Sequence, residues 1–177
     1  VTSLSYVYSG TSNGLYLYFS SAETPVEAGS YSVIPNSASV TNSDSYTAIT
    51  YTNGSLTIAR ATRELAITGN STGKYGSTVS LTATSTPSSN SDGTLSFSAG
   101  ASNACSINTS SGATTITNSL GSCQISASLT QGDNYLATSI SGYLITPAQA
   151  DPINVIVDDK TVTYTGSPAS ITPTYSV

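Results

Sequence analysis

Residues 122–130 read SCQISASLT and alternate strictly between two kinds of side chain. The odd positions hold Cys, Ile, Ala or Leu, and the even positions hold Ser, Gln or Thr. Successive side chains of a β-strand point to opposite faces of the sheet, so this alternation predicts a strand with one face in a core and the other in water. Antiparallel sheets that are covered on one side only have this pattern.

The same alternation recurs in the neighbouring sequence. Residues 60–147 contain about seven short stretches of this kind, spaced by roughly 8–14 residues and separated by turn-forming residues, as in a β-sandwich. Their apolar positions are Leu65, Ile67, Val79, Leu81, Ala83, Leu95, Phe97, Cys105, Ile107, Ile116, Cys123, Ile125, Ala127, Leu129, Ile140 and Leu144. No stretch sustains a helical period of 3.6 residues. We therefore predict an all-β protein without a long helix, with an Ig-like sandwich over residues 60–147.

Residues 1–59, the head, also have β character. The stretch 15–19 (LYLYF) is apolar at every position, which predicts a strand that is covered on both faces or lies against a partner. A turn is expected at Ser9-Gly10, a strand over residues 46–51, and a tight hairpin turn at Asn53-Gly54. By itself, a segment of this length would bury only about 60% of its surface and be marginally stable.

Residues 151–177, the tail, have the pattern of two or three further strands. Two stretches alternate with a period of two, and a turn at 166–168 follows them. So few strands are not stable alone in water, whereas residues 152–177 and 1–59 together have about the length of one sandwich. We therefore expect the tail of one unit to complete the head of a neighbouring unit. The residues expected to be buried in that inter-subunit contact are Ile153, Val155, Val157, Val162 and Tyr164.

The module ends resemble each other. Residues 54–61 (GSLTIARA) and 142–150 (GYLITPAQA) both contain a Gly, a short apolar strand and an Ala-rich exit. Two modules that end in the same way indicate a tandem array. The expected boundaries are 1–59 for part of one module, 60–147 for the sandwich, and 148–177 for a linker and completing strands.

The composition excludes several classes of function. Only 7% of residues are charged, against about 25% in typical domains, while Ser and Thr number 35 and 28. The net charge is −5 and the four basic residues are scattered, so binding to nucleic acid or to an anionic membrane surface is not expected. No apolar run is long enough to predict a membrane-spanning helix. A surface rich in hydroxyl groups favours an extracellular protein, either secreted or at the cell surface.

The residues needed for catalysis or metal binding are missing. The sequence has no His, which excludes Ser-His and Cys-His nucleophilic sites and His-based zinc sites. Asp158-Asp159 lacks the spacing of a calcium loop, and nothing pairs Lys74 or Lys160 with an Asn for an isopeptide bond. We predict no catalytic residue, no metal site and no cofactor, and thus a protein that is not an enzyme.

The two cysteines, Cys105 and Cys123, both occupy inward-facing positions of alternating stretches. A disulfide between them is the preferred interpretation, and two buried free thiols are the alternative. The bridge would close a loop of a length for which cross-linking is worth about 3 kcal/mol through lost chain entropy.

Two resemblances to known families follow from local motifs. Cys105-Ser106-Ile107, residues 121–127 (GSCQISA) and Gly132-Asp133-Asn134-Tyr135 resemble bacterial Ig-like repeats of cell-surface proteins. Residues 162–168, followed by residues 8–11, 25–33, Tyr46 and 54–58, look like the MBG ("mostly beta-grasp") module of bacterial adhesins, here in circularly permuted order. Both families occur as tandem modules of long secreted or surface-anchored proteins, and the resemblance implies no catalytic role.

These observations lead to two hypotheses of function. The leading one is a structural subunit or repeat unit of an extracellular filament, stalk or adhesin, linked head-to-tail through shared β-strands. Its partners would be copies of itself or adjacent repeats of one long chain. The alternative is an adhesin module that binds a glycan or a host protein. Exposed aromatic clusters would favour the alternative, but the alternation places most tyrosines in a core.

Overall fold

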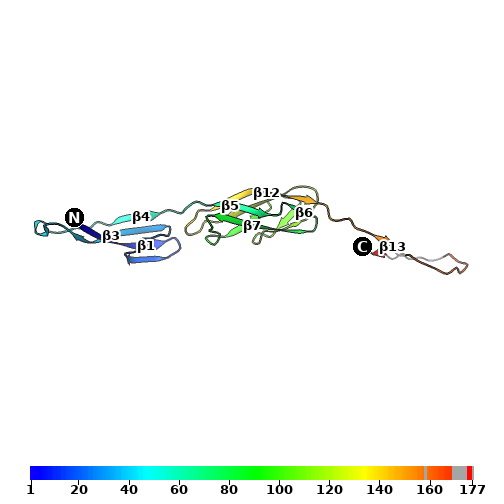
Figure 1. The fold of residues 1–177 in the computed structure, drawn as a ribbon, viewed down its shortest axis with the longest axis horizontal. Coiled ribbons are helices and arrows are strands. Elements are labelled where there is room, and N and C mark those ends of the chain that lie inside the picture. The colour runs from blue at the N-terminus through cyan, green and yellow to red at the C-terminus, as the bar shows by residue number, and fades with distance from the viewer. Residues whose placement is uncertain (158, 169–174, 177) are drawn as a thin grey trace.

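The computed structural model describes residues 1–157, 159–168 and 175–176, so that Asp158 of the Asp158-Asp159 pair lies outside the described residues. Three β units lie in a row: a single head sheet, a two-layered sandwich and a tail hairpin (Figure 1). Among the described residues there is no α-helix. The predicted all-β fold without a long helix is thereby confirmed for this part of the chain.

The head is one four-stranded antiparallel sheet. Its strands are β1 (Ser3–Ser12), β2 (Leu17–Ser21), β3 (Gly29–Ser39) and β4 (Gly54–Ile58). Their order across the sheet is β2-β1-β3-β4, so β2 and β4 are the two edges. Its last strand ends at Ile58.

The predicted turn at Ser9-Gly10 is wrong, because β1 runs through it. Gly10 instead lies at a bulge, where the register between β1 and β2 shifts. Its φ is +151°, and a Cβ at this position would lie 2.5 Å from the carbonyl oxygen of Ser30. Glycine is therefore required here for a close approach of two strands rather than for a turn.

The predicted strand over residues 46–51 and the tight hairpin at Asn53-Gly54 are also wrong. Residues 40–53 form a long connection that contains only a 3-10 turn, Ser43–Ser45, and β4 pairs with β3 across it. The connection is tied to β3 by a hydrogen bond from the Ala38 N–H to the Tyr51 hydroxyl (3.0 Å). An Asn-Gly pair favours a hairpin only where strands flank it on both sides, and here a strand follows it but none precedes it.

Eight strands form the sandwich. They are β5 (Glu64–Gly69), β6 (Thr72–Lys74), β7 (Thr78–Thr86), β8 (Leu95–Ser98), β9 (Cys105–Ile107), β10 (Ala113–Ile116), β11 (Cys123–Leu129) and β12 (Thr138–Ala148). One sheet has the order β5-β7-β10-β9, and the other has the order β6-β12-β11-β8. All neighbours are antiparallel except β12 and β6, which run parallel. The strands of this β-sandwich run from Glu64 to Ala148.

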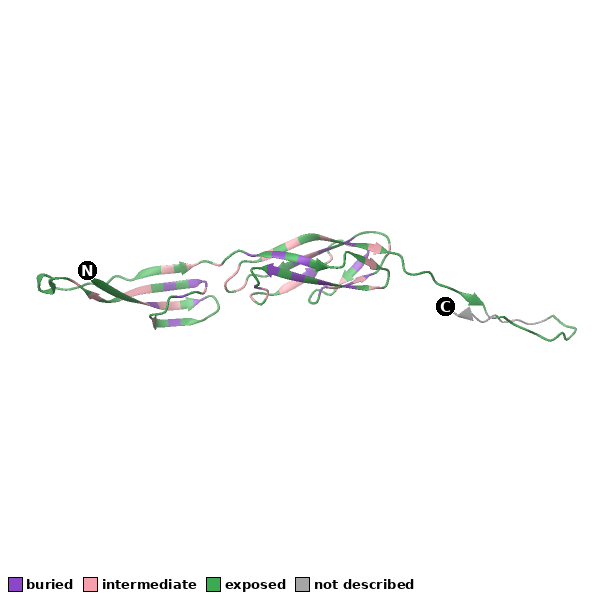
Figure 2. Cartoon of the chain, viewed as in Figure 1, coloured by how far each residue is buried: buried purple, intermediate pink, exposed green. Residues whose placement is uncertain are grey.

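The core of the sandwich lies between its two sheets (Figure 2). The alternation predicted for residues 122–130 is confirmed, because Cys123, Ile125, Ala127 and Leu129 of β11 are buried. Burial of each large aliphatic side chain contributes about 1.5–3 kcal/mol. The side chains with the least exposure are Ile116, Ile125, Leu129, Ile145, Thr114 and Cys123.

A disulfide joins Cys105 on β9 to Cys123 on β11, with an S–S distance of 2.06 Å. The two strands belong to different sheets, so the bridge cross-links the two layers. The predicted disulfide is confirmed, and the alternative of two free thiols is excluded.

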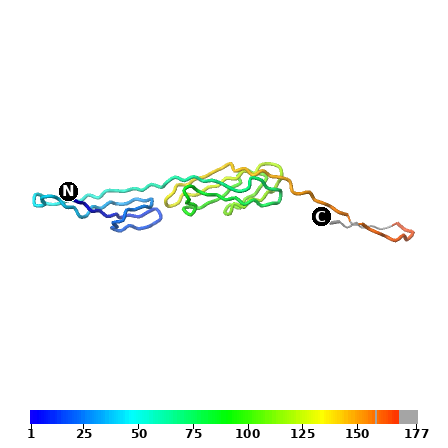
Figure 3. The backbone as a smooth tube through the Cα atoms, in the orientation of Figure 1, coloured from blue at the N-terminus to red at the C-terminus, as the bar shows by residue number. Residues whose placement is uncertain are grey.

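The tail leaves the sandwich at the end opposite to the head sheet (Figure 3). Its two short strands, β13 (Ile156–Val157) and β14 (Tyr175–Ser176), pair antiparallel. The described residues between Asp151 and Pro168 are exposed to solvent. The tail therefore has local strand pairing, but its described residues between Asp151 and Pro168 include no buried side chain.

Removal of the disulfide should destabilise the sandwich. Replacing Cys105 and Cys123 together by Ala should lower its free energy of unfolding by about 3 kcal/mol, because the bridge closes a loop between residues 18 apart in sequence. Urea unfolding monitored by near-UV circular dichroism measures the difference. An equal stability of the two proteins would contradict the prediction, and alkylation without reductant should find no free thiol in the unaltered chain.

Candidate assembly site

The head sheet has one apolar face and one hydroxyl-rich face. Residues that lie directly opposite each other on antiparallel strands share a face, and the register pairs Tyr8 with Val33, and Tyr31 with Leu56. The apolar face contains Tyr6, Tyr8, Tyr18, Tyr31, Val33, Leu56 and Ile58. The opposite face contains Thr11, Ser30, Ser32, Ser55 and Thr57, together with the apolar Val7, Leu17 and Ile34. The tyrosines of these strands therefore gather on one face of the head sheet.

The tyrosines of the apolar face contact each other edge to face. The ring centroids of Tyr18 and Tyr31 are 5.3 Å apart, and those of Tyr6 and Tyr8 are 5.8 Å apart, within the range favoured by aromatic pairs. Tyr31 is buried and its hydroxyl donates a hydrogen bond to the Glu27 carbonyl (2.8 Å). Burial raises the pKa of Tyr31, and the neighbouring Tyr18 and Glu27 raise it further.

No second layer covers this face within the described residues. Tyr6 and Tyr16 are 50% and 61% exposed, although Tyr8, Tyr18 and Tyr31 are buried. The expectation that most tyrosines lie in a core is therefore wrong for this chain. The strand predicted at residues 15–19 is in fact β2, and its Leu17 and Phe19, which lie on either side of Tyr18 in the sequence, are exposed. Leu17 pairs with Thr11 and therefore lies on the face opposite to the tyrosines.

The edge strand β4 is open along its whole length. It pairs with β3 on one side, and no described strand pairs with it on the other. Neither strand pairing nor a hydrogen bond joins the described part of the tail to the head sheet. The head therefore exposes both an apolar face and an unpaired edge.

The predicted inter-subunit residues of the tail are all exposed. Their exposed fractions are 75% for Ile153, 57% for Val155, 61% for Val157, 47% for Val162 and 93% for Tyr164. The structure brings none of them together with the head of its own chain. Their burial in a contact between units stays a prediction.

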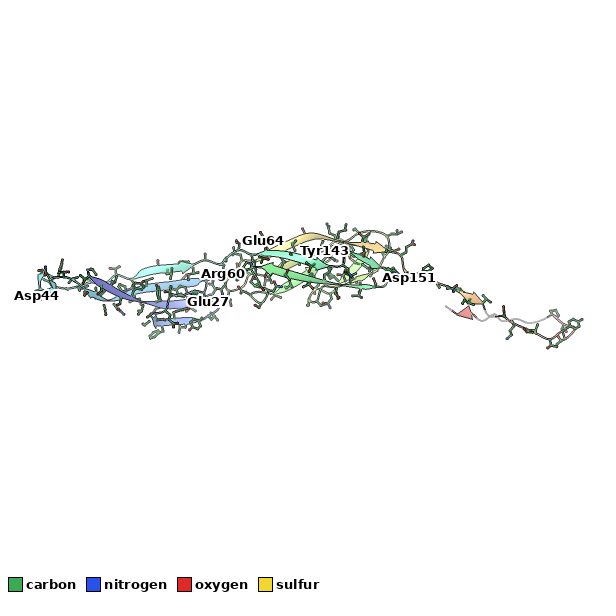
Figure 4. All side chains as sticks on the ribbon, viewed as in Figure 1. Glu27, Asp44, Arg60, Glu64, Tyr143 and Asp151 are labelled. Carbon is green, nitrogen blue, oxygen red and sulfur yellow. A yellow bond between two sulfur atoms is a disulfide. The ribbon has the colours of Figure 1, made fainter. Side chains whose placement is uncertain are left out.

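The junction between head and sandwich is fixed by the turn at residues 132–135. Asn134 accepts a hydrogen bond from the Ala28 N–H (2.7 Å), and its amide group donates one to the Glu27 carboxylate. The guanidinium of Arg60 donates to the Gly132 carbonyl (2.8 Å). Figure 4 labels Glu27 and Arg60 near this junction. The two units are thus joined by side-chain contacts as well as by the linker.

The linker itself pairs with this turn. The Ala61 N–H donates to the Asn134 carbonyl (2.8 Å), and the Leu136 N–H donates to the Ala61 carbonyl (2.9 Å). These two bonds form an isolated parallel bridge between Ala61 and Tyr135. Ala61, in the segment that joins the head to the sandwich, is therefore part of the β structure.

Asp92, in the sandwich loop between β7 and β8, holds the turn at residues 132–135 in place. Its carboxylate accepts backbone N–H groups of three consecutive residues, Asp133, Asn134 and Tyr135. Burial alone would raise the pKa of Asp92, but these three donors and the nearby positive charge of Arg63 lower it below the usual value. The ionised carboxylate is therefore the form that positions Asn134 toward the head.

Arg63 is a buried cation without a carboxylate in direct contact. Its guanidinium donates hydrogen bonds to the carbonyl oxygens of Leu136, Ser89, Asp92 and Thr130 at 2.6–3.0 Å, and it lies 5.7 Å from the Tyr135 ring centroid. Buried charges are tolerated only when such partners replace water. Arg63 and Asp92 are not among the residues predicted from the sequence. The signal in the sequence that could have pointed to them is that charged residues are rare in this chain.

At the other end of the sandwich, the tail is anchored by one exposed ion pair. Lys74 Nζ lies 2.6 Å from the Asp151 carboxylate, and the Tyr75 N–H donates to the Ala148 carbonyl (2.8 Å). Asp151 marks this end in Figure 4. Lys74 thus contacts a carboxylate here and not an Asn.

Comparison with family models, curated proteins and solved structures found no match for this chain. The resemblances to MBG and bacterial Ig-like modules therefore stay predictions from local motifs. The described residues contain no cluster of three metal-ligating side chains, and none of the helices described there is long and apolar enough to cross a membrane.

Replacing Asp92 with Asn should weaken the junction in a pH-dependent way. At neutral pH the free energy of unfolding should fall by about 1.5–3 kcal/mol, as for hydrogen bonds to a charged group. Because the folded pKa lies below the unfolded one, the contribution is complete above the usual carboxyl pKa and is lost as the pH falls through the lowered value. Urea unfolding of both proteins at several pH values measures this.

The control for this experiment is Asp133→Asn, which removes the same charge from an exposed neighbouring position. It should change stability little. A stability difference for Asp92→Asn that stays constant from neutral pH to below the carboxyl range would contradict the role of the ionised form.

Proposed function

We propose that this chain is a structural subunit or repeat unit of an extracellular filament, stalk or adhesin, joined head-to-tail through shared β structure. One observation carries this proposal. The head is a single sheet with an uncovered aromatic face and an open edge, while a tail of exposed apolar strands projects from the opposite end (Figures 1 and 2).

The head sheet and the tail strands can each supply what the other lacks for stability in water. A two-stranded hairpin is at best marginally stable in water, and a sheet with one apolar face needs a second layer. Strand addition to an open edge supplies main-chain hydrogen bonds, and apolar side chains supply the buried area. Because head and tail lie at opposite ends of the row, such a contact does not close on itself and generates an open fibre.

The architecture between the two ends supports a role in an extended assembly. The disulfide across the sandwich is typical of an oxidising compartment, which favours a secreted or cell-surface location. The head–sandwich junction is held by hydrogen bonds in which the Asn134 side chain accepts from the Ala28 N–H and Arg60 donates to the Gly132 carbonyl. In the proposed assembly the neighbouring units are separate chains or adjacent repeats of one polypeptide.

One observation favours the alternative of an adhesin module that binds a glycan or host protein. Tyr6, Tyr16, Tyr46 and Tyr51 are between 45% and 61% exposed, and exposed aromatic rings are typical of binding surfaces. The two functions differ in whether the aromatic face of the head stays accessible in the assembled protein.

Deletion of residues 152–177 tests the proposal. The full chain should associate with rising concentration in sedimentation velocity, whereas the truncated chain should stay monomeric because its strands for the next head are missing. Hydrogen exchange should show faster exchange in β1–β4, while the disulfide-linked sandwich keeps its protection. A full chain that is a compact monomer, with tail amides protected at high dilution, would refute the proposal.

A pair of matched substitutions avoids the deletion. Val162→Asp places a charge at a position expected in the contact and should reduce association strongly, because a buried unpaired charge is costly. Thr161→Asp adds the same charge on the alternate face and should reduce association less. Equal association of both variants with the unaltered chain would contradict a contact through this strand.

A further inference from the structure

We infer that residues 161–163 of one copy add as a parallel strand to the open edge of β4 in the next, with Val162 opposite Ile58. This inference rests on the proposed function and specifies which edge of the head is used, in which direction and in which register. It follows from an internal comparison of the three units of this chain.

The head sheet repeats one sheet of the sandwich with a strand missing. In the sandwich, β8, β11 and β12 are antiparallel neighbours in that order, and β6 lies parallel to β12 at the edge. In the head, β1, β3 and β4 are antiparallel neighbours, and they follow one another in the sequence and across the sheet as β8, β11 and β12 do. The strand β4 therefore corresponds to β12, and the place that β6 takes in the sandwich is empty beside β4.

The tail repeats the beginning of the sandwich. There β5 and β7 pair antiparallel, and the segment between them supplies β6 to the other sheet. In the tail β13 and β14 also pair antiparallel. After each intervening segment the chain turns at a Gly-Ser pair with a left-handed glycine, Gly76 (φ +79°) and Gly166 (φ +77°). The part of the tail before Gly166 therefore corresponds to β6.

The register follows from the sandwich. Pro147 of β12 lies opposite Gly73 of β6, and Gly73 faces the core, since a Cβ there would lie 2.8 Å from Ile116. The exits ITPAQA (145–150) and LTIARA (56–61) match at one Thr and two Ala, which places Ile58 on Pro147.

On the tail side, Thr-x-x-Tyr in residues 72–75 matches residues 161–164, which places Val162 on Gly73. The turn that follows is one residue longer in the tail.

This register also satisfies the chemistry of the head. Ile58 lies on the aromatic face, and residues opposite each other on neighbouring strands share a face. Val162 and, two residues later, Tyr164 then join the tyrosines of that face. The β13–β14 hairpin takes the place of the β5–β7 layer, over the side chains that the head leaves exposed. The other edge, β2, has no counterpart of β6 in this comparison.

Disulfide trapping between two different full-length chains tests the inference. One chain carries Ile58→Cys and the other Val162→Cys; they are mixed at a concentration where the unaltered protein associates, and then oxidised. Neighbouring strands are about 4.8 Å apart, which a disulfide bridges. The native bridge is buried and does not exchange under mild conditions. Mass spectrometry should find several-fold more of the mixed dimer than for Tyr18→Cys, which lies on the same face but on the edge strand β2, mixed with Val162→Cys.

A second pair, Ala59→Cys with Thr163→Cys, tests the same register on the opposite face and should also cross-link. It keeps the test decisive if Ile58→Cys weakens the head. If the chains associate but cross-link only at β2, or if neither pair cross-links at β4, the inference is wrong while the proposed function stands. If the unaltered chain does not associate at any concentration, both the inference and the proposed function are wrong.

Discussion

A β-sheet with one apolar face is stable in water only when a second layer covers that face. The sandwich meets this constraint within itself, because two sheets enclose one core and a disulfide joins the layers. The head does not meet it: its tyrosines contact one another, yet Tyr6 and Tyr16 stay half or more exposed. In the proposed assembly, the tail strands of the next copy supply the second layer that the head lacks.

Charged side chains stabilise the junction between head and sandwich. Only 13 residues of the chain are acidic or basic, and four of them, Glu27, Arg60, Arg63 and Asp92, lie at this junction. Arg63 and Asp92 hold the turn at residues 132–135 through contacts within the sandwich. Asn134 of that turn then binds the head through the Ala28 N–H and the Glu27 carboxylate.

Local alternation predicted much of the fold, and its failures have a common cause. The core of β11 and the partner of Cys105 follow from parity, since a strand has only two faces. Gly10 and Asn53-Gly54 were misjudged because the conformation of a glycine depends on strands distant in sequence. Arg63 contacts carbonyl groups 26–73 residues away, which no local pattern encodes. Alternation in the sequence shows which side chains of a head strand share a face. Whether another layer covers that face is visible only in the structure.

In the proposed filament, parallel addition to β4 has a mechanical consequence. The sandwich enters through β5 and leaves through β12, and β6 pairs parallel with the last residues of β12 where the tail departs. A strand added parallel to β4 beside residues 57–59 would likewise lie where the chain leaves the head for the sandwich. Tension along the row would then run parallel to the paired strands, and the hydrogen bonds of residues 161–163 would have to break together rather than one after another. The same geometry would repeat at both ends of the sandwich, so no unit would be joined to the next by a flexible linker alone.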